Sequence, residues 1–356
     1  MVSFAGGLPS SDSFPDLDRL RVPAGQLQYG PTEGEPGLRS KVAADLRSRG
    51  LDCGADQVLI LSGSQQGIDL VAKLFIDPQT PVAVESPTYL AALQVFRFFG
   101  ARLGAFTIAN AGDLDAAIKD RAFVYAIPNF QNPTGKCYSE AERARLASAC
   151  DRTLTPLYED DPYRDLAYDN RDTSAVCSRL KRAPRIYQGS FSKSLAPGLR
   201  LGYLACSPGL VPYLTRLKQA ADLHSNRVSQ WFVLQQLNEP THDARLASLR
   251  VRYRAKRDQF DAELERHFSE LASWTSPAGG LFFWLALNTT RPIDTRRLLP
   301  AAIEQGVAFM PGEPFFPVPV AAASALRLNF SYAAAAETRR GLATLARIFR
   351  EALGNL

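Results

Sequence analysis

Short apolar runs alternate with amphipathic stretches between residues 56 and 206 of this chain. The runs, rich in β-branched and aromatic residues, predict strands at 58–61, 81–84, 123–127, 155–158, 185–188 and 201–205. The stretches between them predict helices at 65–76, 88–99, 139–150 and 175–180. Ser139 and Glu142 have the spacing of a capping box, which places the start of the third helix. This alternation predicts an α/β fold whose mostly parallel sheet is covered by helices on both faces.

The pattern changes after residue 230. Apolar residues then recur at intervals of 3, 4 or 7, which predicts one long amphipathic helix through Leu246, Leu249, Tyr253, Phe260, Leu264 and Phe268. We expect a hairpin near Gly279 and Gly280, strands at 281–287 and 325–330, and helices at 295–305 and 336–353. These elements indicate a smaller C-terminal α+β domain. The expected organisation is an N-terminal segment (1–30) packing on the small domain (237–356), and a large domain (31–236).

Composition narrows the class of protein. The chain has 356 residues, of which 46% are hydrophobic and 22% charged, as is usual for soluble globular proteins. The net charge of +5 is dispersed, and the basic stretch 250–257 alternates with apolar residues, which favours a solvated helix face over a nucleic-acid interface. The five cysteines form no CxxC pair and the three histidines no metal-ligand spacing, so we expect no metal and a reducing compartment. No signal peptide or membrane span is recognisable, and we expect a cytoplasmic protein.

Lys193 is the most informative residue. It lies after a predicted strand in the run 189–200, Gly-Ser-Phe-Ser-Lys-Ser-Leu-Ala-Pro-Gly-Leu-Arg. A lysine in such a turn can form a Schiff base with an aldehyde, while the serines and Arg200 hold a nearby phosphate. Pyridoxal phosphate (PLP) carries both groups. A surface lysine in an ordinary loop is the alternative explanation.

Polar residues follow the other predicted strands, at the edge where open α/β sheets bind ligands. The segment 62–67 opens a helix and suits an anion, although an N-cap without ligand would look the same. Tyr89 could stack on a heterocycle or pack in a core, and Asn132 offers an amide from a rigid turn. The acidic residues 159–161 end a buried strand, which is costly unless they meet a cation. Together these groups match the needs of a PLP site.

With these motifs the chain resembles the PLP-dependent aminotransferases of fold type I, class I/II, in particular the 2-aminoadipate, lysine-pathway and multi-substrate group. The resemblance runs from residues 4–9 to 327–331 and rests on the motifs 131–135 (Gln-Asn-Pro-Thr-Gly), 159–163 (Glu-Asp-Asp-Pro-Tyr) and 190–193 (Ser-Phe-Ser-Lys). It implies transfer of an amino group from an L-amino acid to a 2-oxo acid by a ping-pong mechanism through aldimine and ketimine intermediates.

The resemblance also assigns roles. Lys193 would be the Schiff-base lysine and proton shuttle, and Asp160 would pair with the pyridinium nitrogen, with Asp161 as the competing choice. Asn132 and Tyr163 would hydrogen-bond the phenolic oxygen, with Tyr163 counted among the catalytic residues. The remaining cofactor contacts would come from Tyr89, which stacks on the ring, and from the phosphate ligands Ser64, Gln65, Ser190 and Arg200. The substrate would be bound by Arg327, which clamps the α-carboxylate, together with Asn132 and Gly7.

The same resemblance implies a homodimer with shared active sites, in which Tyr29 of one subunit reaches the phosphate of the other. No nucleic acid, membrane or metal partner is expected. The chain begins almost directly at the Gly6-Gly7 motif, so we expect the N-terminal helix common in this group to be missing or much reduced. That departure concerns the cover of the substrate pocket, and hence specificity.

Three other functions compete with this one. A transcription regulator with the same PLP-binding module would carry a DNA-binding domain before Gly6, where only five residues stand. Elimination, decarboxylation or racemisation would use the same cofactor residues, so a PLP-dependent lyase, decarboxylase or racemase stays open, although Arg327 favours cleavage of the Cα–H bond. A non-catalytic homologue is disfavoured because Lys193 and Asp160 are both present.

The sequence indicates the substrate less clearly than the cofactor. Arg19, Arg21 and Arg39 could recognise a second carboxylate, although exposure is the commoner fate of arginine. Phe14, Phe282 and Phe315-Phe316 could line an apolar pocket or a core. We expect an amino donor with an apolar or long side chain, and 2-oxoglutarate or pyruvate as the acceptor.

Overall fold

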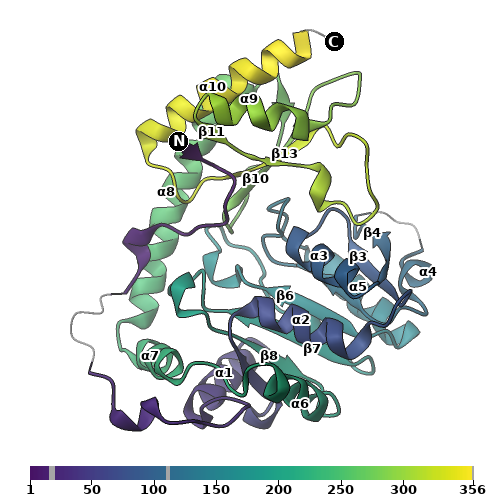
Figure 1. Cartoon of the computed structure of the whole chain (residues 1–356), viewed down its shortest axis with the longest axis vertical. Helices are drawn as coiled ribbons and strands as arrows, with labels where there is room; N and C mark the ends of the chain where they lie inside the picture. The colour runs from purple at the N-terminus through teal and green to yellow at the C-terminus, as the bar shows by residue number, and fades with distance from the viewer. Residues whose placement is uncertain (16–20, 110–112, 355–356) are drawn as a thin grey trace.

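A seven-stranded sheet forms the centre of the larger part of the molecule, in a computed structural model that describes residues 1–15, 21–109 and 113–354 (Figure 1). The strand order is β2-β8-β7-β6-β5-β3-β4. The strands are β2 (Val58–Leu61), β3 (Pro81–Glu85), β4 (Arg102–Phe106), β5 (Val124–Ala126), β6 (Leu157–Asp161), β7 (Arg185–Ser190) and β8 (Gly202–Cys206). β8 runs antiparallel to β2 and β7, and the other neighbouring pairs are parallel. The fold class expected from the sequence, an α/β fold with a mostly parallel sheet, is confirmed.

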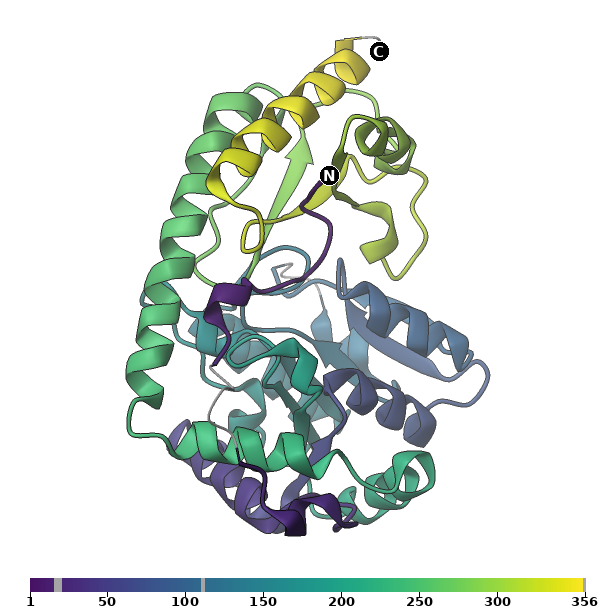
Figure 2. The same ribbon diagram turned by 60° about the vertical axis from the view of Figure 1, so that its left-hand side comes forward.

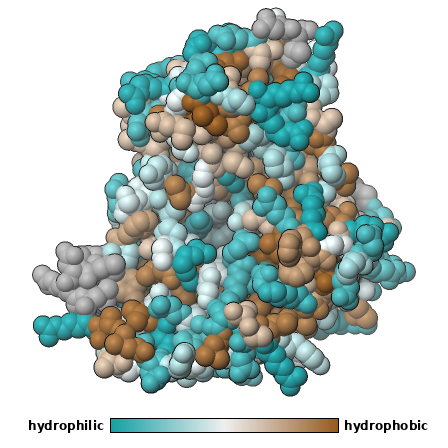
Figure 3. Space-filling model, in the orientation of Figure 1, coloured by the Kyte–Doolittle hydropathy of each residue, from teal (hydrophilic) through white to brown (hydrophobic). Residues whose placement is uncertain are grey.

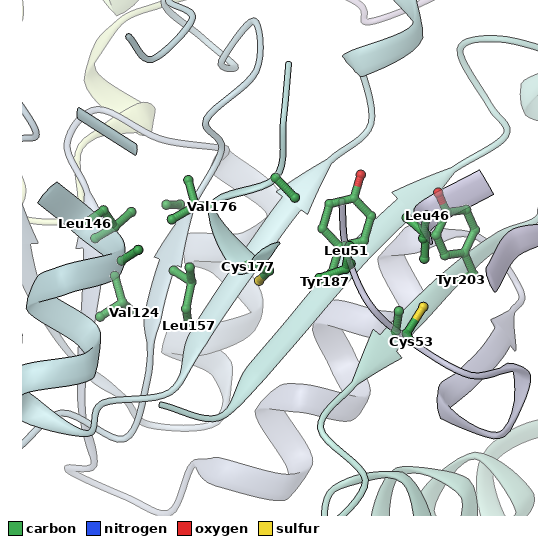
Figure 4. Close-up of a cluster of buried hydrophobic side chains, with 14 of the residues drawn as sticks. Leu46, Leu51, Cys53, Val124, Leu146, Leu157, Val176, Cys177, Tyr187 and Tyr203 are labelled. Carbon is green, nitrogen blue, oxygen red and sulfur yellow. The ribbon is translucent and has the colours of Figure 1, made fainter. Parts of the chain in front are cut away.

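Helices cover both faces of this sheet because successive strand residues point to opposite sides. In β2, Val58 and Ile60 join one hydrophobic core, while Leu59 and Leu61 join the other. The first core lies against α1 (Pro36–Ser48), α4 (Leu114–Ile118), α5 (Glu140–Thr153) and α7 (Arg227–Asn238). The second lies against α2 (Ser64–Phe75), α3 (Leu90–Phe98) and α6 (Val211–Asp222). Figure 4 shows part of the first core, where Leu157 lies near Leu146 of α5 and Tyr187 lies farther along the sheet, past Cys177.

The smaller part of the molecule is built on a four-stranded antiparallel sheet in the order β12-β13-β10-β9. Its elements are α8 (His242–Phe268), β9 (Ala272–Ser273), β10 (Phe282–Leu287), α9 (Leu299–Glu304), β12 (Met310–Pro311), β13 (Ala325–Asn329) and α10 (Ala335–Gly354). Figures 1 and 2 both show the long α8 running along one side from the large sheet to this smaller part. No helix of the described residues is long and apolar enough to cross a membrane.

The N-terminal segment joins the smaller part. Its strand β1 (Val2–Ser3) pairs in parallel with β11 (Val307–Ala308). The next residue, Phe4, is fully buried and packs edge-on against Phe260 of α8, with ring centroids 5.4 Å apart. This anchoring carries residues 5–9 across the C-terminal edge of the large sheet, where the candidate chemistry lies. The domain boundaries expected near residues 30 and 236 stay a prediction.

The structure corrects three details of the sequence-based elements. The helix expected at 175–180 is only a four-residue 3-10 helix, Val176–Arg179, because six residues are too few for a stable α-helix and Glu159 accepts its first two N–H groups. The strand expected at 155–158 is β6, Leu157–Asp161, whose acidic end is fully paired into the sheet. The edge strand β4 was not expected, since its residues before Phe106 are exposed or half-exposed and carry little hydrophobic signal.

Candidate active site

A cavity of about 440 Å³ lies between the C-terminal edge of the large sheet and the smaller part of the molecule. Every site residue expected from the sequence lines it except Tyr29. These residues are Gly7, Ser64, Gln65, Tyr89, Asn132, Asp160, Tyr163, Ser190, Lys193, Arg200 and Arg327. Segments from the whole length of the chain therefore meet at one place, as expected for the carboxyl ends of an open α/β sheet.

Lys193 lies in the turn that follows β7, with its amine inside the cavity. Its Nζ donates a hydrogen bond to the carbonyl oxygen of Gly7 over 2.9 Å. Burial, together with the nearby guanidinium groups of Arg200 and Arg327, lowers the pKa of this amine to about 8. At pH 7 about a tenth of Lys193 is consequently the neutral, nucleophilic amine, far more than for an ordinary lysine.

Asp160 presents a buried carboxylate to the cavity from the end of β6. Its Oδ2 accepts a hydrogen bond from the Tyr125 hydroxyl over 2.7 Å, and its Oδ1 accepts one from the Gln188 amide over 2.9 Å. Burial raises the pKa of Asp160 to about 6, although the two donors oppose the shift. A carboxylate in this position is strongly stabilised by a ligand that brings a positive charge.

Asp161 points to the opposite face of the sheet, so strand alternation decides between the two aspartates. Its Oδ2 accepts hydrogen bonds from Asn129 and Tyr187, at 3.0 and 2.8 Å. Burial raises its pKa, while the guanidinium groups of Arg164 and Arg143 act in the other direction. Asp161 does not line the cavity, and it is excluded as the residue that meets a ligand there.

An anion cup forms where α2 begins. Its floor is the helix N-terminus at Ser64, whose backbone N–H groups carry partial positive charge. Arg200 lies directly beside it, because Gly63 adopts a φ of +83° and has no side chain. A Cβ at Gly63 would stand 2.4 Å from Nη2 of Arg200, so only glycine leaves room for the guanidinium. The hydroxyl groups of Ser190 and Ser192 line the same side of the cavity.

Three further side chains shape the middle of the cavity. Tyr89, at the start of α3, places its hydroxyl 3.4 Å from Oε1 of Gln65. Tyr163 is buried, which raises the pKa of its hydroxyl, and its ring packs edge-on against Phe282 with centroids 5.8 Å apart. The phenol of Tyr163 therefore stays protonated and is available as a hydrogen-bond donor. Asn132 closes the far side from the loop after β5.

The guanidinium group of Arg327, on β13, is buried, and one of its N–H donors has no partner among the described residues. Nη1 donates to Oδ1 of Asn132 over 2.7 Å, Nη2 donates to the carbonyl oxygen of Ala5, and Nε is buried without a partner. The group lies over the rings of Phe282 and Phe315, at 4.1 and 5.1 Å from the centroids. Burial lowers its pKa to about 10, so it remains charged at neutral pH. A buried cation with a free N–H favours a carboxylate ligand.

Tyr29 lies outside the cavity of this chain. It is 76% exposed, and its ring packs edge-on against His224 with centroids 5.7 Å apart. Of the other arginines considered for substrate binding, Arg21 is exposed and Arg39 donates to the carbonyl oxygen of Val58, so neither lines the cavity. Arg19 lies outside the described residues.

Sequence reasoning missed the residues that support the site from behind. Tyr125 and Gln188 contact Asp160 from the two neighbouring strands, and nothing in the local sequence marks them except that a glutamine is unusual in a buried strand. Ser192 was part of the lysine motif but received no role. Phe282 and Phe315 line the cavity, which was one of the two places expected for them. Phe14 is exposed and does not line the cavity.

Comparison with known proteins adds an independent line of evidence. The family model described as aminotransferase class I and II matches residues 21–345. The chain is 33% identical over 371 residues to aromatic-amino-acid aminotransferase 1 of Thermococcus litoralis, covering 99% of this chain and 88% of the relative. It is 37% identical over 333 residues to 2-aminoadipate transaminase of Thermus thermophilus, covering 89% and 82%.

Solved structures agree with these relatives. One is the crystal structure of the α-aminoadipate aminotransferase LysN of Thermus thermophilus, complexed with N-(5′-phosphopyridoxyl)-L-leucine. It matches this chain with a TM-score of 0.89 and 34% identity, covering 100% of this chain and 93% of that one. The likeness includes both the large sheet and the smaller part of the molecule.

Proposed function

Because the chain belongs to the family of class I and II aminotransferases and is a PLP-dependent aminotransferase, we propose that Lys193 is the residue that binds the cofactor covalently. One observation carries this proposal: the Lys193 amine, the Asp160 carboxylate and the anion cup at α2 open into a single cavity. Each group complements one part of PLP. The amine suits its aldehyde, the carboxylate its ring nitrogen, and the cup its phosphate.

Bound PLP supplies a carbon that condenses with amines and a cationic ring that withdraws the electron pair left when the Cα–H bond breaks. The protein residues then have separable tasks. Asp160 keeps the ring nitrogen charged, and Nζ of Lys193 takes the proton from Cα of the substrate. Ser64, Gln65, Ser190 and Arg200 hold the phosphate, so the ring cannot drift from the amine.

Tyr89, Asn132 and Tyr163 complete the cofactor contacts in this proposal, Tyr89 against the ring and the other two at its phenolic oxygen. Arg327 binds the α-carboxylate of the substrate through its remaining donor capacity, beside Asn132 and the carbonyl edge at Gly7. Since Arg327 holds the carboxyl group in place, Cα–H cleavage is favoured over loss of carbon dioxide. This arrangement agrees with aminotransferase activity and disfavours the decarboxylase alternative.

We propose an amino donor with a neutral, apolar or long side chain, and 2-oxoglutarate or pyruvate as the acceptor. The described cavity lining contains three cations, Lys193, Arg200 and Arg327, and each already has a task. Apart from Asp160, the rest of the described lining is neutral and includes Leu8, Leu90, Gln94, Met310 and Phe315. The relative named for aromatic amino acids, and the relative solved with a leucine adduct, support this substrate class.

We further propose a homodimer in which Tyr29 of one chain reaches the phosphate site of the other. Tyr29 and Leu27 are each 76% exposed, which is unusual for large apolar side chains, and Val22 is also exposed nearby. Figure 3 shows hydrophobic atoms gathered at the lower left of the molecule, the side on which Figure 1 places this N-terminal segment. The cytoplasmic location expected from the sequence stays a prediction.

The experiment that tests the proposed substrate class is a half-reaction screen. The PLP-loaded protein is mixed with each amino acid in turn, and the loss of the visible cofactor absorbance is recorded. We expect fast conversion with leucine or aromatic amino acids and slow conversion with aspartate, while glutamate or alanine also converts because it is the amino form of the acceptor. Conversion limited to the acidic amino acids would overturn the proposed class, and release of pyruvate without conversion would point to lyase chemistry.

A further inference from the structure

We propose that Tyr125 and Gln188 are positioning residues that keep Asp160 charged and keep the ring proton of PLP on its nitrogen rather than on the carboxylate. The inference rests on the proposed role of Asp160. It assigns a task to two buried residues that do not touch the cavity.

The geometry is a clamp formed by three adjacent strands. β6, which carries Asp160, lies between β5 and β7, and Asp160 is directly opposite Gln188 in the β6–β7 register. Tyr125 of β5 donates to Oδ2 over 2.7 Å, while Gln188 of β7 donates to Oδ1 over 2.9 Å. Both donors are fully buried, and Asp160 is 4% exposed. Each carboxylate oxygen is thus fixed from one side, which orients the group toward the cavity.

The orientation of the Gln188 amide is itself determined. The hydroxyl of Tyr158 donates to Oε1 of Gln188 over 2.7 Å, so the amide nitrogen faces Asp160. The amide fits only because α2 has a glycine at position 67, where a Cβ would stand 2.0 Å from Oε1 of Gln188. Four elements, β5, β6, β7 and α2, therefore contribute to two hydrogen bonds on one carboxylate. The packing of a hydrophobic core would not require these two hydrogen bonds.

Tyr125 and Gln188 are uncharged donors, and this determines how they act on Asp160. Burial raises the pKa of Tyr125 well above its ordinary value, with the charge of Asp160 as the next cause, so its phenol stays protonated. The other titratable groups near Asp160 are the phenols of Tyr89, Tyr158 and Tyr163 and the carboxyl group of Asp161. Among the described residues no cation acts on Asp160, in contrast to Asp161, which faces Arg143 and Arg164.

Two neutral donors lower the proton affinity of a carboxylate without cancelling its charge. The carboxylate then attracts the N–H of the pyridinium ring but does not remove its proton. A cation in place of these donors would compete with the ring for the same charge. Loss of the donors would make Asp160 a stronger base, so the proton would move from the ring nitrogen to a carboxylate oxygen. The ring would then withdraw electrons less strongly.

The test uses PLP labelled with ¹⁵N at the ring nitrogen, bound to the wild type, to Tyr125→Phe, to Gln188→Leu and to the double variant. The ¹⁵N chemical shift reports whether the ring nitrogen carries a proton. A matched control is Tyr187→Phe. It removes a hydroxyl that donates over 2.8 Å to Asp161, the neighbour of Asp160 in β6 that points to the other face of the sheet. Tyr125→Phe removes a single atom, so it remains informative if Gln188→Leu folds poorly.

We expect a protonated nitrogen in the wild type and in Tyr187→Phe, and a shift toward the unprotonated value in Tyr125→Phe and in the double variant. The pH midpoint of the visible absorption should rise by about 1 unit, because a less positive ring lets Nζ of Lys193 keep its proton to higher pH. PLP affinity should fall by about 10-fold for each donor removed.

An unchanged ¹⁵N shift and pH midpoint in Tyr125→Phe and the double variant would overturn the proposal, even if activity fell, because a loss of packing alone moves neither. Equal changes in Tyr187→Phe would also overturn it. Failure of the wild type to bind PLP with a visible absorption band would instead refute the proposed role of Lys193.

Discussion

Nζ of Lys193 and the carbonyl oxygen of Gly7 are joined by a hydrogen bond of 2.9 Å, although 186 positions separate the two residues in the chain. The contact places the N-terminal segment over the lysine and closes one side of the cavity. It also depends on β1, whose pairing with β11 and whose neighbour Phe4 fix the path of this segment. The lysine is thus held in a low-dielectric site beside two arginines, which accounts for its lowered pKa.

This pKa predicts the pH dependence of cofactor capture. With a pKa of about 8 for Lys193, the neutral amine increases about ten-fold per pH unit below that value and then levels off. The rate at which cofactor-free protein takes up PLP should follow the same curve in stopped-flow absorbance. A rate that keeps rising up to about pH 10 would indicate an ordinary lysine and contradict the burial argument.

Asp160→Asn should change stability with a characteristic pH dependence. In the cofactor-free protein the pKa of Asp160 is raised from 3.8 to about 6, so the folded state binds more protons than the unfolded state between these values. The free energy of unfolding therefore falls as pH rises through this window, by about 3 kcal/mol, and is constant above it. Asparagine does not titrate.

The variant should consequently gain about 3 kcal/mol relative to the wild type between about pH 4 and about pH 7, as measured by urea denaturation at each pH. Other buried acids, such as Glu85 and Glu159, are present in both proteins and cancel in the difference. When PLP is added, the wild type should become the more stable of the two proteins, because only the carboxylate stabilises a charged ring. A stability difference that does not vary with pH would show that Asp160 is not titrating in this window.

Gly63→Ala should weaken binding of the phosphate and leave the ring contacts intact. The new Cβ would stand 2.4 Å from Nη2 of Arg200, and alanine is strained at a φ of +83°. We expect the dissociation constant for PLP to rise by about 10- to 100-fold, in line with loss of one or two charge-assisted hydrogen bonds. Pyridoxal, which lacks the phosphate, is the matched ligand, and its affinity should hardly change. Equal losses for both ligands would place the defect outside the anion cup.

Arg327→Lys should separate substrate binding from cofactor binding. Lysine keeps the charge but loses the planar donors that meet Asn132, the N-terminal segment and a carboxylate at once. We expect kcat/KM for the amino donor to fall by about 100-fold, with the visible absorbance of bound PLP unchanged. Arg296→Lys, at an exposed arginine outside the cavity, is the control and should be neutral. A loss of PLP absorbance in Arg327→Lys would assign the arginine to the cofactor instead.

The sequence was sufficient for the parts of the site that are local. Lys193, Asn132 and Asp160 each follow a strand within a short motif, so strand prediction and residue type placed them at one sheet edge. The choice between Asp160 and Asp161 needed the true end of β6, which runs to Asp161 rather than stopping at Tyr158. Once the strand includes both residues, alternation alone turns one to the cavity and the other away.

The remaining parts depend on contacts between distant segments. Tyr125 and Gln188 support Asp160 only because β5 and β7 flank β6, and local residue patterns do not encode which strands become neighbours. The bond between Arg327 and Asn132 spans 195 positions and exists only when the smaller sheet packs over the larger one. The predicted task of Tyr29 depends on a second chain, which no pattern within one chain can supply.

Covalent attachment of PLP to Lys193 is the central claim, and peptide mapping tests it most directly. The PLP-loaded protein is reduced with borohydride, digested and analysed by mass spectrometry. We predict that the mass of a reduced phosphopyridoxyl group appears on the peptide that contains Lys193, and that Lys193→Ala abolishes it. Stoichiometric labelling of another lysine, such as the buried Lys218, or persistence of labelling in Lys193→Ala, would contradict the account.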